Sequence, residues 1–155
     1  MSLLESDCWP ARSVGGVEVN GYTIEPGADL AEANLSGANL RRADLTEADL
    51  RRANLRGANL ERANLKRTTL AAANLRGANL RMAYLSGMGS SGVGLEGANL
   101  AGANLAGANL ISADLRGAYL RGANLERANL NGTVADRNTR WPEGFDPVAA
   151  GVIFD

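Results

Sequence analysis

An all-β solenoid, in which short segments wind into stacked coils, is the fold class that this sequence predicts. A five-residue unit, Ala-Asn/Asp-Leu-x-x, runs almost unbroken from Ala28 to Gly132. Leucine fills every fifth position from Leu30 to Leu130 except at Ser90. Opposite charges also recur 20 residues apart, a distance of four units. Repetition this strict predicts the architecture, but residues repeated for packing do not mark individual sites.

The five-residue period excludes the two common alternatives. An α-helix turns about 100° per residue, so successive leucines would lie about 140° apart and scatter around the helix. In a flat strand, an odd period sends successive leucines to opposite faces. The chain must therefore turn within each unit so that every leucine points inward. Glycine at the second variable position suits the positive φ of a type II turn, and Asn or Asp before leucine can hydrogen-bond to the turn backbone.

The charge pattern indicates how many units make one coil. Outward positions of the same type, compared at a spacing of 20 residues, carry opposite charges six times and like charges three times. A spacing of 15 gives three against six, and a spacing of 25 gives one against four. Because opposite charges stabilise neighbouring strands, we expect about five four-sided coils with leucine at the centre. One expected column of the core is Leu30, Leu50, Leu70, Leu110 and Leu130, with Ser90 in the slot of the fourth coil. The opposite pairs are Glu32/Arg52, Arg41/Glu61, Glu61/Arg81, Glu47/Arg67, Arg76/Glu96 and Glu96/Arg116.

Both ends of a solenoid expose backbone edges and core side chains, and these need caps. Residues 1–27 are the expected N-terminal cap, with a hairpin whose turn is Asn20-Gly21. Residues 133–155 are the expected C-terminal cap, which leaves 28–132 as the repeat domain. We expect the aromatic residues outside the repeats to cover the core; they include Trp141, Phe145 and Phe154.

Residues 88–94 interrupt the repeats. The leucine phase is kept, since Leu85 and Leu95 are ten residues apart. Ser90 would place a hydroxyl where leucine belongs, which is costly if the group is buried without a partner. We therefore expect a local bulge or loop. Two interpretations stay open: one repeat that has drifted in sequence, or a mobile binding loop.

The units Ala38-Asn39-Leu40-Arg41-Arg42 and Ala58-Asn59-Leu60-Glu61-Arg62 match the consensus of the pentapeptide repeat family, which the chain strongly resembles. This resemblance covers about two-thirds of the chain and implies a right-handed quadrilateral β-helix. The tail at 139–147 resembles an ending found in bacterial, notably cyanobacterial, members. Most members of the family have no assigned biochemistry.

Composition excludes several function classes. The sequence contains no histidine, which removes imidazole bases and histidine-ligated metals, and we expect neither a metal nor a cofactor. Neither a phosphate-binding loop followed by a helix nor a cysteine cluster is found. The densest carboxylates, Asp44, Glu47 and Asp49, are expected on exposed faces without a pocket, so we interpret the chain as a non-enzyme. A single cysteine, Cys8, and the lack of a long apolar run or a signal peptide favour a soluble cytoplasmic protein.

Two function classes remain, together with a weaker third. The first is a protein-interaction or scaffold module, either a monomer or an end-to-end dimer. The second is mimicry of duplex DNA, as in the quinolone-resistance members that act on DNA gyrase. That role uses an acidic rod with phenylalanine in the core, whereas residues 28–132 hold 13 basic and 9 acidic residues, net +4, and no phenylalanine. The third is weak nucleic-acid binding through basic faces, but several of those arginines have stacked glutamate partners.

One candidate interaction surface combines exposed apolar and aromatic residues near the interruption. Tyrosine replaces Asn or Asp before leucine at two positions, and methionine or isoleucine occupies outward turn positions. We expect Ile111 one coil above Ser91. In the alternative that stays open, the segment 88–94 folds down and covers these side chains. The candidate residues are Met82, Tyr84, Met88, Ile111 and Tyr119.

Overall fold

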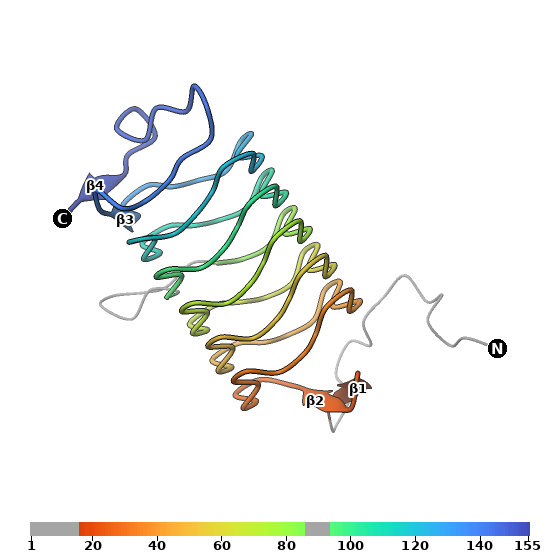
Figure 1. Cartoon of the computed structure of the whole chain (residues 1–155). Helices are drawn as coiled ribbons and strands as arrows, with labels where there is room; N and C mark the ends of the chain where they lie inside the picture. Colours follow the sequence, from red (N-terminus) through yellow and green to blue (C-terminus); the bar gives the residue numbers. More distant parts are fainter. Residues whose placement is uncertain (1–15, 86–93) are drawn as a thin grey trace.

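The structure is a computed structural model that describes residues 16–85 and 94–155. The chain forms an elongated rod of stacked turns, with a hairpin at one end and the C-terminal tail at the other (Figure 1). Among the described residues, no helix has the length and apolar character needed to cross a membrane.

The N-terminal end carries the hairpin that the sequence predicts. Strands β1 (Val17–Val19) and β2 (Tyr22–Ile24) pair antiparallel. Asn20 and Gly21 form the turn with φ of 52° and 81°, the left-handed conformations that a tight hairpin requires. The hairpin also contacts the first coil, because the Tyr22 hydroxyl accepts a hydrogen bond of 3.2 Å from the backbone N–H of Asn34.

Four parallel ladders of β-bridges run along the rod, and each unit contributes one residue to one ladder. Partners in a ladder are 20 residues apart over most of the rod, as with Asp29 and Asp49. Ladder A comprises Asp29, Asp49, Thr69, Gly94, Asp114 and Val134; ladder B comprises Asn34, Asn54, Asn74, Asn99, Tyr119 and Arg140; ladder C comprises Asn39, Asn59, Asn79, Asn104 and Asn124; ladder D comprises Asp44, Asn64, Tyr84, Asn109 and Asn129.

Each turn between ladders has the same local chemistry. The backbone N–H of Ala33 donates to the carbonyl of Leu30 at 3.1 Å, which closes a four-residue turn. The second variable residue has positive φ, 59° at Glu32 and 66° at Gly37, as the type II turn predicts. The carboxylate of Asp29 accepts from the N–H two residues ahead at 3.2 Å. This hydrogen bond recurs wherever Asn or Asp stands in a described ladder, and it explains why these residues precede most of the leucines.

Leucine and alanine fill the interior, as the sequence predicts. Every described leucine from Leu35 to Leu120 is at most 1% exposed. Thr68 replaces alanine in one unit and is also buried, and its hydroxyl donates to the carbonyl of Leu65 at 2.6 Å. The buried polar group is therefore satisfied.

The rungs change register at the interruption, and this corrects one prediction. Thr69 pairs with Gly94, 25 residues ahead, and the N–H of Leu70 donates to the Gly94 carbonyl at 2.7 Å. Five extra residues therefore lie between Tyr84 and Gly94. Leu95 takes the core slot above Leu70 that the 20-residue period assigns to Ser90, so the predicted column is wrong beyond Leu70. Ser90 itself lies outside the described residues.

The same shift explains why one predicted charge pair, Arg76/Glu96, does not form, whereas Arg116 pairs with Asp114 and Asp155 instead of the predicted Glu96. Four of the six predicted pairs lie below the interruption and form ion pairs, with nitrogen–oxygen distances of 3.1 to 3.5 Å. The pair Arg76/Glu96 is wrong because it spans the extra residues; the carbonyl of Glu96 instead accepts from the Ala72 N–H at 2.8 Å. The four confirmed pairs are Glu32/Arg52, Arg41/Glu61, Glu61/Arg81 and Glu47/Arg67.

The C-terminal tail continues the coil for part of a turn and then folds beyond it (Figure 1). Strand β3 (Val134–Ala135) pairs parallel with β4 (Ile153–Phe154). Trp141 and Phe145 stack with ring centroids 5.3 Å apart and pack against the core, as predicted for covering aromatics. Phe154 departs from that prediction, since it is 47% exposed. It lies on the last strand, where no further rung covers it.

Candidate interaction surface

The candidate surface is centred on Tyr84, which stands in ladder D among asparagines and one aspartate. Its side chain is 49% exposed. The ammonium of Lys66 lies 5.5 Å from the centre of the Tyr84 ring, within the range of a cation–π contact. Tyr84 therefore presents an aromatic face with an adjoining positive charge.

Met82 occupies the corner that precedes Tyr84. It is 44% exposed, and its backbone has a φ of 58°. Its thioether lies over Gly107 in the next coil, where an added Cβ would come within 2.6 Å of the sulfur. The absence of a side chain at Gly107 lets Met82 lie flat beside ladder D. An exposed, adaptable thioether next to an aromatic ring is a common composition in protein interfaces.

Ile111 lies at the corner that follows ladder D, two residues after Asn109. Asn109 is the bridge partner of Tyr84, so Ile111 and Tyr84 belong to adjacent coils on the same side. Ile111 is half-buried, and its N–H donates to the Asn109 side chain at 3.1 Å. Met88 lies outside the described residues. We name the set Met82, Tyr84 and Ile111, with Lys66, the Tyr84 surface.

Tyr119 does not belong to the Tyr84 surface. It stands in ladder B, two ladders away from ladder D, and is 40% exposed. The structure therefore divides the sequence-predicted set between two different sides of the coil. Asn99, the partner below Tyr119, accepts a hydrogen bond of 3.1 Å from the backbone N–H of Ala101 through its side-chain carbonyl. Tyr119 has no side-chain carbonyl for the corresponding bond.

Three exposed apolar residues at the C-terminal end were not predicted as surface residues. Val148 is 72% exposed, and Ile153 and Phe154 of β4 are 56% and 47% exposed. The sequence offers no pattern that would separate them from covering residues, since Val152 beside them is buried.

Charged groups on the rod form structural pairs. The side-chain hydrogen bond from Arg51 holds the pKa of the Asp49 carboxyl below its usual value. Burial raises the pKa of Asp114, but hydrogen bonds from the Arg116 side chain and backbone outweigh it and leave the pKa lowered. Within the part of the chain that the structure describes, no group of three or more potential metal ligands occurs. These carboxylates are fixed as charged partners and are poor candidates for proton transfer.

Comparison with known proteins agrees with this geometry. The family model described as pentapeptide repeats matches residues 27–62, 53–87 and 95–134. No curated protein matches the sequence. Among solved structures, the pentapeptide repeat protein Rfr23 from the cyanobacterium Cyanothece 51142 is 46% identical, with a TM-score of 0.59 over 63% of this chain and 63% of that chain. The chain thus spans 63% of the length of that relative.

Two further structures extend the comparison. The pentapeptide repeat protein alr5209 from Nostoc PCC 7120 is 36% identical over 82% of this chain and 84% of that one, with a TM-score of 0.49. QnrB1, a plasmid-mediated fluoroquinolone resistance protein, shares the fold at 20% identity, with a TM-score of 0.56 over 83% of this chain and 75% of that one. On the family match over most of its length, the chain belongs to the pentapeptide repeat family.

Proposed function

We propose that this chain is a non-enzymatic interaction module that binds a protein partner through the Tyr84 surface. The observation that carries the proposal is Tyr84 itself: it replaces the asparagine of the ladder, and the residue is 49% exposed. Asparagine or aspartate at this position satisfies a backbone N–H two residues ahead, as Asn64 does at 3.3 Å. Tyrosine has no carbonyl or carboxylate for that bond, so folding alone does not explain its presence.

The chemistry around Tyr84 favours a protein partner. Aromatic, methionine and cationic side chains are enriched at the centres of protein interfaces, where a rigid aromatic ring supplies contact area with little loss of entropy. Met82 and Ile111 extend this apolar area on either side of the ring. Lys66 adds a charge that a partner carboxylate can meet.

The non-enzymatic part of the proposal rests on which titratable side chains the chain contains and how they are paired. The sequence lacks histidine, and the paired carboxylates of the rod are held ionised by arginines.

The wider architecture is also inferred from the family: we expect about five right-handed, quadrilateral coils over 28–132, with 1–27 and 133–155 as caps. We infer a cytoplasmic location from the single cysteine.

The test uses two matched substitutions that both restore the ladder residue. Tyr84→Asn removes the aromatic face in ladder D, and Tyr119→Asn makes the same change in ladder B as a control. Each variant is immobilised and used to capture proteins from the source cells, with mass spectrometry as the readout. We expect Tyr84→Asn to lose specific partners with an unchanged melting temperature, and Tyr119→Asn to keep them. Capture that Tyr84→Asn leaves unchanged would eliminate the surface.

A further inference from the structure

Where two adjacent coils are both described, the edge of the lower coil that faces the C-terminal end is hydrogen-bonded to the coil above. Three kinds of backbone group point along the rod from each unit: the N–H of leucine, the N–H of the second turn residue and the carbonyl of alanine. Leu105 and Gly107 donate to the next coil at 2.8 Å each, and the Ala108 carbonyl accepts from it at 2.9 Å. This pattern repeats from coil to coil.

The last complete coil breaks this pattern on two of its sides. The N–H groups of Gly122, Leu125, Arg127 and Leu130 donate to no acceptor among the described residues, and the carbonyls of Ala123 and Ala128 accept from no donor there. The tail explains why. Leu120 still donates to the Arg140 carbonyl at 2.6 Å, but the chain then leaves the ladder. We name the stretch 122–130 the open edge.

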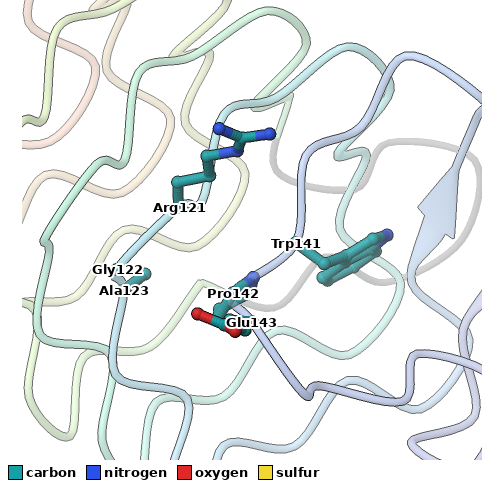
Figure 2. A pocket seen from close by; sticks show the side chains of 6 residues that line it. All are labelled: Arg121, Gly122, Ala123, Trp141, Pro142 and Glu143. Atoms are coloured by element: carbon teal, nitrogen blue, oxygen red, sulfur yellow. The ribbon is translucent and has the colours of Figure 1, made fainter.

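The tail leaves the open edge accessible beside Gly122 and covers its leucine side chains. A pocket of about 660 Å³ separates Gly122 and Ala123 from Pro142 and Glu143 of the tail (Figure 2). Leu125 is 8% exposed, more than any described leucine inside the rod. An unpaired edge above an apolar interior is a template for an added strand.

We propose that the open edge binds an extended segment of a partner protein as one further rung of the coil. The segment runs parallel to residues 121–130. Its carbonyls accept from the four free N–H groups, and its own N–H groups donate to the carbonyls of Ala123 and Ala128. Main-chain pairing of this kind supplies affinity, and side chains at fixed spacing supply specificity.

Side-chain chemistry defines the segment. In the free chain Leu125 and Leu130 are only 8% and 2% exposed, because side chains of the tail pack against this end of the core. Two apolar side chains of the segment, five residues apart, would take the place of those tail side chains above the two leucines. At the second turn position, the residue would lie above Arg127, whose nearest carboxylate, Glu126, lies 3.9 Å away. Opposite charges stack at that position elsewhere in the rod, as Arg67 does on Glu47 at 3.1 Å. The predicted occupant is therefore a repeat-like segment with a carboxylate between its two apolar residues.

The tail favours a single strand over a second rod. It folds beyond the last coil next to the open edge (Figure 1), so the flat end of a second copy would meet the tail before the edge. A single extended segment requires only that the tail side chains above Leu125 and Leu130 move aside. The proposal is independent of the Tyr84 surface, which lies on the side of the rod.

The experiment measures amide hydrogen exchange by NMR on the full chain. In the free protein, we expect the amides of Leu125 and Leu130 to exchange at least about 100-fold faster than that of Leu105, because a free N–H needs no opening of structure. The probe is an acetylated synthetic peptide with the sequence of residues 26–35, which carries Glu32 at the second turn position. Saturating peptide should slow exchange at Leu125 and Leu130 about tenfold or more.

Charge reversal provides the matched controls. A peptide with Glu32→Arg should bind more weakly, and the protein variant Arg127→Glu should prefer that peptide. Three results would overturn the proposal: protection of the Leu125 amide in the free protein equal to that of Leu105, no slowing with either peptide, or protection that rises with protein concentration alone, which would make a second copy the occupant. Tyr84→Asn should leave peptide binding unchanged, so failure here is separable from failure of the proposed function.

Discussion

Deleting residues 88–92 should leave the rod intact and slightly more stable. The ladder passes from Tyr84 to Gly94 in ten residues, where every other step from Asp29 to Val134 takes five, so the deletion restores a normal unit. Val93 would then fill the alanine slot, with Gly94 and Leu95 unchanged above Thr69 and Leu70. The connection between Leu85 and Gly94 shortens from eight residues to three, which lowers the free-energy cost of closing the loop by at most about 0.9 kcal/mol.

The assay is chemical denaturation followed by circular dichroism, with amide exchange at Leu70 as a local probe. The Leu70 N–H donates to Gly94 at 2.7 Å, so its protection reports the register directly. The control deletion, residues 98–102, also removes one unit but takes buried Ala98 and Leu100 out of the core, and it should destabilise by about 2–5 kcal/mol. A loss of more than about 2 kcal/mol in the first deletion, or loss of Leu70 protection, would refute the assigned register.

Four further outcomes follow from the same structure. Leu60→Ala should cost about 3–4 kcal/mol, since it empties a fully buried site, whereas Leu125→Ala at the open end should cost about 1 kcal/mol less; equal costs in urea titrations would contradict this. Gly57 has a φ of 66° and open space around it, so Gly57→Ala should lower the free energy of unfolding by about 1–2 kcal/mol through backbone strain alone. Ala72 has a φ of 57°, so Ala72→Gly should raise the melting temperature. The Gly117 N–H lowers the pKa of Asp136 to about 2, so its contribution to stability is present above pH ~4 and lost as pH falls towards 2; Asp136→Asn should remove that part of the acid dependence. DNA gyrase should not be inhibited, given a repeat region of net +4, and inhibition of supercoiling at micromolar protein would show otherwise.

The sequence was sufficient to predict the fold because each five-residue unit contains the residues that form its own turn and its own part of the core. Leucine, alanine and the Asn or Asp before leucine each have one role, and the structure shows that role at Leu60, Ala58 and Asn59 alike. The hairpin at 17–24 was also predictable, since Asn20-Gly21 has strong turn chemistry. These predictions depend on local patterns, which a single sequence contains in full.

The register could not be predicted across the interruption for a physical reason. The extra residues number five, which equals one unit, so leucine keeps its phase whether the segment forms a rung or lies outside the ladder. The charge comparison was equally insensitive, because only pairs such as Arg76/Glu96 span the break. The open edge could not be predicted for a related reason. Nothing in the sequence shows that the tail leaves the ladder after Arg140, since Trp141 and Phe145 would be expected to pack on the core whether or not the tail formed another rung.

The shifted register also creates the candidate surface. With a constant 20-residue period, Asn109 would stand in ladder A, and Ile111 would follow it at a corner away from Tyr84. The step of 25 residues turns the upper part of the rod by one side relative to that expectation and places Asn109 directly on Tyr84. Ile111 then completes an apolar strip with Tyr84 and Met82 across two coils. The surface is therefore a property of how the two halves of the rod are joined, and substitutions in either half should act on it together.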